Sequence, residues 1–118
     1  MIDVKQLVGV LRALGDRNRL RVLAALASRP ACVGELVRAL KLKQPNLSRH
    51  LKVLEAAGLV TPRRDGPWVV YHLRPAPPVT PLLRYVRLVG RKDRVFRADA
   101  AALARTRLKP APKKQPKK

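Results

Sequence analysis

The feature that most constrains the fold of this sequence is a series of four short apolar stripes at helical spacing. In each stripe, leucine, valine or alanine recurs at positions i, i+3, i+4 and i+7, which places these side chains on one face of an amphipathic helix. The stripes are, in chain order, Leu7–Leu14, Leu20–Ala27, Val33–Leu40 and Leu47–Leu54. The sequence therefore predicts four consecutive helices.

Residues that typically begin and end helices stand at the borders of these stripes. Gly15 suits a helix C′ position, and Asp16 can cap the helix that follows. The fourth stripe is entered through Pro45 and left at Gly58, the usual placing of proline near a helix start and glycine just after its end. We therefore expect the fourth helix to span Gln44–Ala57.

Two short strands are expected after the fourth helix. Leu59–Arg64 and Trp68–Leu73 flank the pair Asp65-Gly66, which is a typical hairpin turn. Pro62 has no amide hydrogen to donate, so its strand should be short or lie at an edge.

The chain then continues through a proline-rich connector, Arg74–Pro78, into a last helix from Val79 or Thr80 to about Arg105. Gly90 should weaken the middle of this helix. The resulting order, α-α-α-α-β-β-α, predicts a mainly α fold with a β-hairpin wing, that is, a winged helix-turn-helix.

Charge indicates the class of partner. The chain has 27 Lys and Arg against 7 Asp and Glu, a net charge of +20, whereas a solvated surface normally mixes both signs. Such a chain suits a polyanion, and we favour nucleic acid over an anionic membrane surface or acidic proteins. No apolar run approaches a membrane span, and Met1–Gln6 does not resemble a secretory leader. Together with the single cysteine, these features favour a cytoplasmic, nucleoid-associated protein.

We expect residues 1–108 to form one DNA-binding and dimerisation domain. The tail Lys109–Lys118 consists of Lys, Pro, Ala and Gln, so it has little to bury and should be disordered. Eight basic and two acidic residues lie between Arg84 and Arg107. We hypothesise that this basic stripe and the tail follow flanking DNA phosphates, the alternative being a solvated outer face.

A helix in the major groove needs an apolar face toward its own domain and a polar face toward the bases. Leu47, Leu51 and Leu54 share one face of the fourth helix, and polar residues occupy the other. Arg49 could contact guanine through two hydrogen bonds, and Asn46 or Gln44 could contact adenine in the same way. Ser48 suits a phosphate. The residues predicted to contact DNA from this helix are Gln44, Asn46, Ser48, Arg49, His50 and Lys52.

Two of the predicted contact sites have plausible structural roles instead. His50 lies between the two faces of the helix and could reach a phosphate or be packed inside. Arg63 and Arg64, beside the hairpin turn, could lie against the DNA backbone or in the minor groove. Alternatively, their charges could merely protect an exposed strand edge.

The sequence resembles the ArsR/SmtB family of metalloregulators. The segments that carry the resemblance are LGDRNRLRVL at 14–23, QPNLSRHLKVL at 44–54, EAAGLV at 55–60, RRDG at 63–66 and WVVYHL at 68–73. The resemblance implies a homodimer through the first and last helices, and a repressor that leaves its operator when an inducer binds. It also implies that Gln44, Asn46, Ser48 and Arg49 read bases and phosphates.

The sequence departs from this family where metals would bind. The arsenic sensors carry a Cys-x-Cys pair in the third helix, whereas this chain has Ala31-Cys32-Val33-Gly34, and no histidine follows His72. A thiophilic metal needs two or three thiolates and zinc about four ligands, so we expect no metal, no cofactor and no metal response. Cys32 could sense oxidants, but a small buried apolar role is the commoner one for a lone cysteine.

Two functions remain open from the sequence. One is a sequence-specific repressor that binds double-stranded DNA. The other is a weakly specific nucleoid-type or RNA-binding basic protein. An enzyme is not expected, because acidic residues are few and scattered, and neither a nucleophile–base pair nor a glycine-rich phosphate loop is present.

Overall fold

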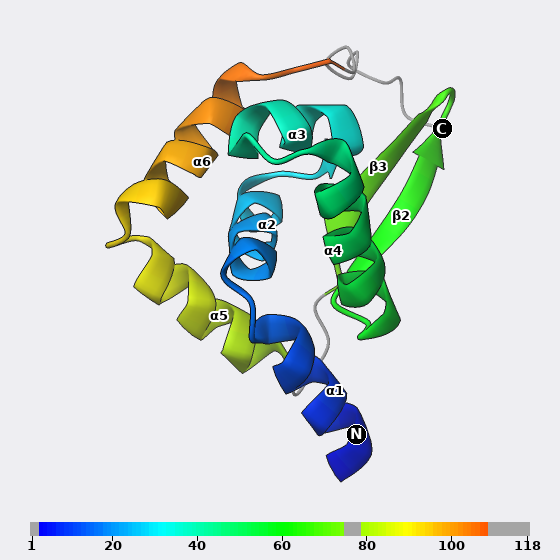
Figure 1. Cartoon of the computed structure of the whole chain (residues 1–118), viewed down its shortest axis with the longest axis vertical. Helices are drawn as coiled ribbons and strands as arrows, with labels where there is room; N and C mark the ends of the chain where they lie inside the picture. The colour runs from blue at the N-terminus through cyan, green and yellow to red at the C-terminus, as the bar shows by residue number, and fades with distance from the viewer. Residues whose placement is uncertain (1–2, 75–78, 109–118) are drawn as a thin grey trace, which may run out of the picture.

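A computed structural model describes residues 3–74 and 79–108, and it has the predicted winged-helix architecture (Figure 1). The elements in chain order are α1 (Val4–Leu14), α2 (Arg17–Ser28), β1 (Ala31–Cys32), α3 (Val33–Leu40), α4 (Gln44–Ala56), β2 (Val60–Asp65), β3 (Trp68–Leu73), α5 (Val79–Gly90) and α6 (Arg94–Arg105). Residues 75–78 of the predicted connector and the tail 109–118 lie outside the described residues.

The core is built mainly from the second, third and fourth apolar stripes; of the first, Val10 is buried, whereas Leu7 and Leu11 are exposed. Helix α2 lies at the centre, with α3, α4, α6 and the sheet around it. The residues with at most 1% exposure include Leu23, Leu36, Leu40, Leu47, Leu51, Leu54, Leu59 and Leu103. Because leucine dominates this list, helix-on-helix packing of branched aliphatic side chains supplies most of the buried apolar surface.

The predicted borders of the first four helices agree with the structure, but the conformation at one of them differs. The Asp16 carboxylate accepts hydrogen bonds from the amides of Asn18 and Arg19 at 2.8 and 3.1 Å, so it caps α2. Gly58 has φ +76°, the left-handed conformation that glycine adopts readily after a helix. Gly15 also ends its helix, but its φ of −81° shows that the turn does not use the left-handed conformation expected of a C′ glycine.

The wing belongs to a three-stranded antiparallel sheet with the order β1-β3-β2. Strand β2 lies at the edge, where Pro62 costs no internal hydrogen bond, and Gly66 forms the tight turn with φ +60°. The sequence analysis missed β1, because two residues are too few to show an alternating pattern. Its pairing of Ala31 with Tyr71 and of Cys32 with Val70 ties the base of the wing to the start of α3.

The prediction of a single last helix is wrong. Helix α5 ends at Gly90, and Asp93 caps α6 by accepting from the amides of Val95 and Phe96 at 2.9 and 3.1 Å. A Cβ atom at Gly90 would come within 2.8 Å of the Phe96 ring, so glycine permits the close approach at the turn. Helix α6 therefore packs back on α2 and α3 instead of continuing away from them.

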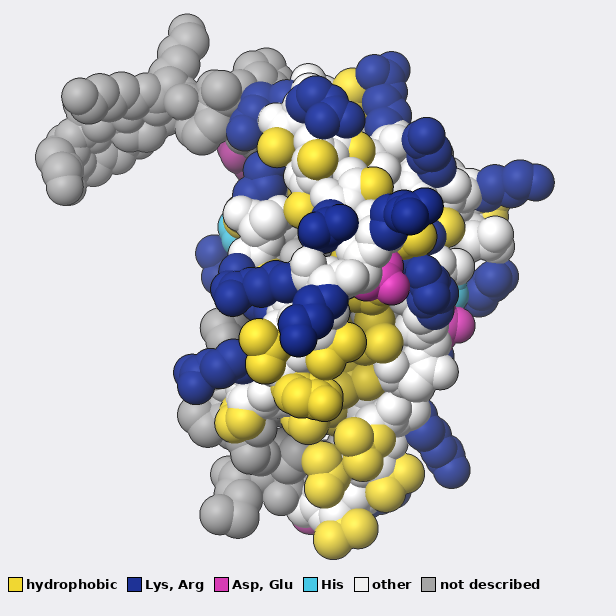
Figure 2. All heavy atoms as spheres, turned by 90° about the vertical axis from the view of Figure 1, so that its left-hand side faces the viewer, with side chains coloured by type: hydrophobic (Ala, Val, Ile, Leu, Met, Phe, Trp, Pro, Cys, Tyr) yellow, Lys and Arg dark blue, Asp and Glu magenta, His cyan; other side chains and the backbone are white. Residues whose placement is uncertain are grey.

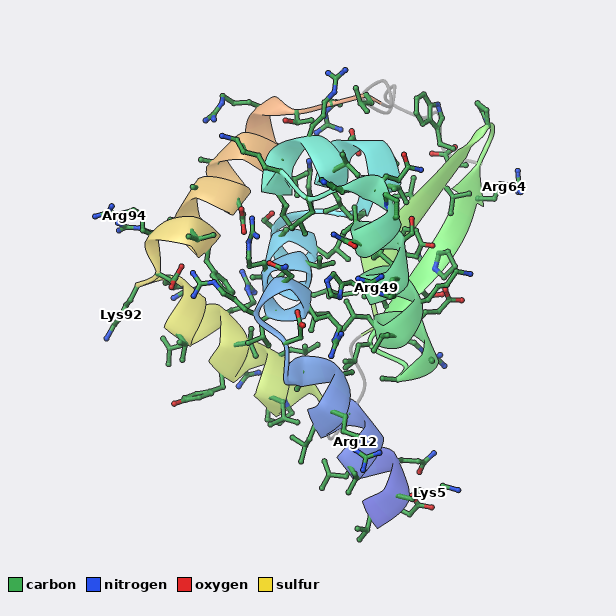
Figure 3. All side chains as sticks on the ribbon, in the orientation of Figure 1. Lys5, Arg12, Arg49, Arg64, Lys92 and Arg94 are labelled. Atoms are coloured by element: carbon green, nitrogen blue, oxygen red, sulfur yellow. The ribbon has the colours of Figure 1, made fainter. Side chains whose placement is uncertain are left out.

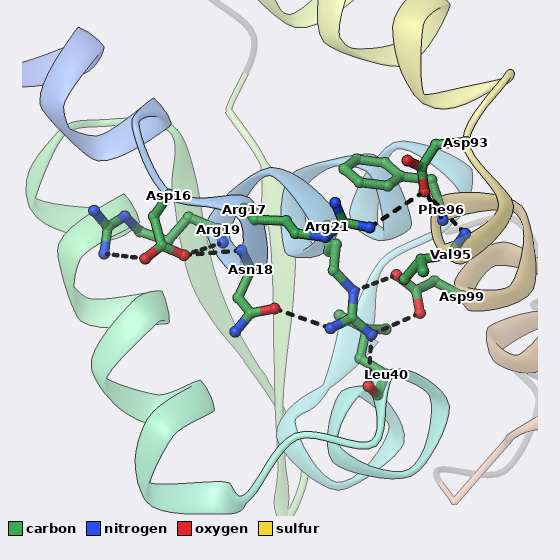
Figure 4. A network of polar contacts seen from close by, with 10 residues as sticks. All are labelled: Asp16, Arg17, Asn18, Arg19, Arg21, Leu40, Asp93, Val95, Phe96 and Asp99. Atoms are coloured by element: carbon green, nitrogen blue, oxygen red, sulfur yellow. Dashed lines mark hydrogen bonds and ion pairs between the residues drawn. The ribbon is translucent and has the colours of Figure 1, made fainter.

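A buried ion pair fastens α6 to the domain (Figure 4). Arg21 on α2 donates to both carboxylate oxygens of Asp99 on α6, at 2.8 and 2.9 Å, and the two side chains are 12% and 6% exposed. The same guanidinium donates to the Leu40 carbonyl at 2.6 Å and to Asn18 Oδ1 at 2.9 Å. The hydrogen bond to Asp99 raises the pKa of Arg21 above its already high value. One arginine therefore connects three helices.

We expect Asp99→Ala to lower the free energy of unfolding by about 3–5 kcal/mol, because the Arg21 charge would stay buried without its partner. The double variant Arg21→Met/Asp99→Leu should lower the free energy of unfolding less, because it removes both charges and leaves apolar side chains in their place. Arg17→Ala serves as the control, because it removes an exposed ion pair with Asp93 and should cost below about 1 kcal/mol. Urea unfolding measures all three, and equal losses for Asp99→Ala and Arg17→Ala would contradict the assignment.

Candidate nucleic-acid interface

Helices α3 and α4 form the helix-turn-helix, joined by the residues Lys41–Lys43. Lys41 has φ +56°, an uncommon left-handed conformation for a residue other than glycine. This conformation ends α3 and turns the chain sharply into α4. Leu47, Leu51 and Leu54 then seat α4 against the core with at most 1% exposure. The turn and the leucines together fix which face of α4 points outward.

The outward face of α4 is polar and basic. Gln44, Asn46, Arg49 and Lys52 are exposed, and Ser48 is partly buried. An Arg49 guanidinium nitrogen donates to Asn46 Oδ1 at 3.0 Å, so the two side chains share one patch of surface. Figure 3 labels Arg49 on α4. The remaining guanidinium and amide donors can make the base-edge contacts predicted for these two residues.

The start of α4 lacks a side-chain cap. Its N-cap residue is Lys43, whose side chain makes no capping hydrogen bond, where a serine would commonly do so. The positive end of the helix dipole is therefore flanked by the exposed cations Lys41 and Lys43. This arrangement suits a phosphate group. The sequence analysis did not include these two lysines among the contact residues, although their position beside the turn could have indicated them.

His50 takes the packed position rather than the exposed one. It is 8% exposed, and its Nδ1 lies 3.4 Å from a guanidinium nitrogen of Arg19. Burial lowers the pKa of His50, and the positive charges of Arg19 and Arg49 lower it further. The Asp16 carboxylate acts in the opposite direction but does not outweigh them. A neutral histidine therefore joins α4 to the start of α2. Of the two roles open from the sequence, this geometry fits structural packing.

The wing carries exposed arginines beside α4. Arg63 and Arg64 lie on β2 near the turn, and both are exposed. Arg64 points outward from the strand in Figure 3. Strand β2 packs against α4, so the wing and this helix are neighbouring elements. Both carry exposed cationic residues.

The residues at the start of α3 do not fit a thiophilic metal. Cys32 is 5% exposed, and burial raises the pKa of its thiol. The neighbouring carboxylate, Glu35, is occupied by hydrogen bonds to its own chain, among them the Cys32 amide at 3.0 Å. Within the described residues, no three His, Cys, Asp or Glu side chains gather as a metal site would require. A buried, protonated thiol matches the small apolar role.

A second surface is apolar and lies on α1 and α5 (Figure 2). Its large exposed side chains are Val4, Leu7, Val8 and Leu11 of α1 and Tyr85, Leu88 and Val89 of α5. A hollow of about 490 Å³ adjoins it, lined mainly by apolar side chains such as Leu14, Leu20 and Phe96. A contiguous apolar surface of this kind marks an interaction site. In contrast, the part of the molecule above it in the same view is rich in Lys and Arg side chains.

Known proteins resemble this chain in both sequence and fold. Residues 16–61 match the family described as bacterial regulatory protein, arsR family. The arsenic resistance transcriptional regulator ArsR1 of Pseudomonas putida is 44% identical over 70 residues, which are 58% of this chain and 55% of that protein. The HTH-type transcriptional repressor SmtB of Mycobacterium tuberculosis is 47% identical over 64 residues, 54% of this chain and 47% of the repressor. The chain thus spans about half the length of these curated relatives.

The fold also matches a solved structure. The homodimeric winged helix-turn-helix DNA-binding domain Mb0332 of Mycobacterium bovis, described as a possible ArsR-family transcriptional regulator, superimposes with a TM-score of 0.66. It is 28% identical, and the match covers 75% of this chain and 82% of the domain.

Among the described residues, no helix combines the length and the apolarity needed to cross a bilayer.

We expect the free energy of unfolding to fall as the pH is lowered from about 7.5 to 5, because His50 has a lower pKa folded than unfolded. The unfolded chain then binds the proton first, so stability present above the unfolded pKa is lost on acidification. His50→Gln should flatten this dependence. The pKa of the other histidine, His72, is also lowered by burial, so His72→Gln should remove only the His72 contribution and leave that of His50 in place. Urea titrations at several pH values test this, and an unchanged slope in His50→Gln would contradict it.

Proposed function

Because this chain belongs to the ArsR family of bacterial regulatory proteins, we propose that it is a transcriptional repressor that binds operator DNA as a homodimer. The observation that carries the proposal is the division of α4 into a leucine face buried in the core and an outward face bearing Asn46 and Arg49. A helix divided in this way can enter the major groove without exposing its apolar residues.

The proposed contacts fall into two groups. Gln44, Asn46 and Arg49 read base edges, because their amide and guanidinium groups can form paired hydrogen bonds. Ser48, Lys52, Arg63 and Arg64 contact phosphates or the minor groove, together with Lys41 and Lys43 beside the turn. His50 supports α4 from inside and is left out of the contacting set, since it is buried.

The proposed dimer uses the apolar surface of α1 and α5. The sequence analysis predicted the first helix and a single last helix, which the structure divides into α5 and α6. Its second half, α6, packs inside its own domain, where Leu103 is fully buried, so we assign the interface to its first half, α5. Leu11, Leu88 and Val89, by contrast, are about half exposed. The homodimeric state of the related Mycobacterium bovis domain supports a pairing of this surface with its copy.

The competing function is a weakly specific basic protein, which the net charge of +20 alone would allow. The ordered outward face of α4 favours specific binding. At about 150 mM salt a repressor should prefer its operator over random duplex by at least ~10³-fold. A flat preference would favour the competing function.

The double variant Asn46→Ala/Arg49→Ala should bind a site selected from random DNA more weakly, by about 1–3 kcal/mol for each lost base contact. Binding to unrelated duplex should change much less. The control is Arg94→Ala, an exposed arginine at the corner between α5 and α6, on the opposite edge of the molecule from Arg64 (Figure 3). Fluorescence anisotropy measures both. A folded double variant that keeps its affinity and preference would refute the proposed site.

Leu11→Glu should convert the dimer into monomers, because it places a charge in the apolar surface of each protomer. Val69→Glu is the matched control, since Val69 has a comparable exposure of 38% but lies on the wing. Sedimentation equilibrium distinguishes the two states. Dimers that persist in Leu11→Glu, at the concentration where wild type is dimeric, would place the interface elsewhere.

A further inference from the structure

A small hollow lies at the corner between α5 and α6. It measures about 160 Å³, and its lining residues belong to α2, α5, α6 and the turn between the last two helices. Three of them are arginines, namely Arg87, Arg91 and Arg97. Among the described residues that line the hollow, none is Asp or Glu. Three positive charges therefore border one small space whose wall carries no acid.

The reversal between α5 and α6 brings these arginines together. The Arg91 amide donates to the Arg87 carbonyl at 3.1 Å, so the two residues lie one helical turn apart on the same face. A Cβ atom at Gly90 would come within 2.8 Å of the Phe96 ring, and this close approach places the next residue, Arg97, near the end of α5. In one straight helix, Arg97 would lie about 9 Å beyond Arg91 along the axis. The cluster therefore depends on the break between the two helices.

The three guanidinium groups are not occupied by the domain itself. These arginines are exposed, and none makes a side-chain hydrogen bond or ion pair with the described part of the chain. Arg21 and Arg29, in contrast, bind the carboxylates of Asp99 and Glu35. Because like charges repel, a group of unpaired cations is stabilised by an anion placed among them. The paired donors of each guanidinium remain available for such an anion.

The rest of the lining limits the kind of ligand. The Ser28 hydroxyl donates its hydrogen to the Ala25 carbonyl at 2.6 Å, so it has no second one for a ligand. Ala24, Phe96 and Ala100 offer apolar surface. Pockets that enclose whole drug-sized molecules measure roughly 300–1,000 Å³, so this smaller hollow fits a single acidic group. Recognition of that group falls to the arginines.

A phosphate group matches three arginines better than a carboxylate does. Near pH 7 a phosphate monoester carries about −1.5 to −2 charges and offers three strong acceptor oxygens. These oxygens can accept paired hydrogen bonds from more than one guanidinium. A carboxylate has one charge and two oxygens, which a single arginine can bind through both of its parallel donors.

We infer that the hollow binds the phosphate group of a small molecule, with inorganic phosphate as its simplest form, through Arg87, Arg91 and Arg97. This inference goes beyond the proposed function, because the proposed DNA contacts lie on α4, on the turn before it and on the wing. It assigns a ligand to a different part of the domain.

The position of the hollow suits an effector that does not compete with DNA. The neighbouring residues Lys92 and Arg94 lie at the opposite edge of the molecule from Arg64 (Figure 3). Gly90 and Phe96 also line the larger apolar hollow described above, so the site adjoins the proposed dimer surface. A bound phosphate would therefore sit beside the contact between protomers and away from the operator.

Isothermal titration calorimetry of the full chain with inorganic phosphate, in about 100 mM sodium chloride at about pH 7.5, tests the site. Wild type should bind phosphate with a dissociation constant below about 1 mM. Glycerol 3-phosphate, a phosphate monoester, should compete for the same site, and acetate should bind more weakly than either. The triple variant Arg87→Gln/Arg91→Gln/Arg97→Gln should bind phosphate at least about tenfold more weakly, because glutamine lacks the charge and the paired donors.

The matched control is Arg84→Gln/Arg94→Gln/Arg105→Gln, which removes the same charge from exposed arginines of α5 and α6 that do not line the hollow. It should bind phosphate as wild type does, and thermal melting checks that both triple variants are folded. Absence of phosphate binding in wild type, or an equal loss in the two triple variants, would refute the site. Acetate that binds as tightly as phosphate would refute the choice of ligand.

A further measurement separates a small phosphate ligand from the phosphates of DNA. On a duplex of ~30 base pairs, about three helical turns, the two triple variants should bind with similar affinity by fluorescence anisotropy. A distinctly larger loss in the variant of the hollow would mean that the DNA backbone occupies it, and the inference would be wrong.

Failure of the proposed function would look different. The calorimetry contains no DNA, so phosphate binding would persist even if Asn46→Ala/Arg49→Ala left operator binding unchanged. Conversely, a normal effect of that double variant on DNA, together with no phosphate binding by wild type, would overturn the further inference alone.

Discussion

The arrangement of the proposed interface depends on the burial of three leucines of α4. Leu47, Leu51 and Leu54 are almost completely removed from water, and each contributes about 1.5–3 kcal/mol by its burial. Because they lie on one face, they fix the rotation of α4 about its own axis. That rotation alone decides that Asn46 and Arg49 point outward and that His50 points inward. Polar recognition residues are thus positioned by apolar contacts on the other side of the helix.

The few acidic residues of the chain are used mainly to hold its parts together. Three of the seven acidic residues cap the starts of helices: Asp3 caps α1, Asp16 caps α2 and Asp93 caps α6. Among the described residues two are buried, Asp99 and Glu35. Asp99 binds Arg21 of α2 and so holds α6, and Glu35 binds Arg29, just after α2, and the Leu108 amide beyond α6. Most of the positive charge is therefore not neutralised within the domain and remains available to a polyanion.

Because the chain breaks between α5 and α6, the two helices pack in different places. Helix α5 keeps exposed apolar side chains that form one surface with those of α1 (Figure 2). Helix α6 instead closes the core and returns the chain toward the wing. A single continuous helix could not do both, because its far end would project away from α3. Gly90 and the cap at Asp93 allow the reversal, and the Arg21–Asp99 pair holds it in place. The shape of the second surface and the exit of the chain beside the wing both follow from this reversal.

The sequence by itself determined the local elements. Helical spacing of leucines, the cap at Asp16, the turn at Gly66 and the outward polar face of α4 all arise from residues within a few positions of one another. Such short-range patterns can be read along the chain. Gly90 and Asp93 also carry the stop and start signals of two helices, but helical spacing on both sides obscured them. Strand β1 was too short to show any pattern.

The tertiary structure alone decided the contacts between residues far apart in the sequence. Arg21 meets Asp99, Glu35 meets the Leu108 amide, and His50 meets Arg19 because helices distant in the chain pack on a shared core. Whether an arginine is exposed or pairs with a buried acid depends on that packing and not on its sequence neighbours. Sequence spacing thus indicated which residues of α4 could face DNA, and three-dimensional packing determined which charges remain free to do so.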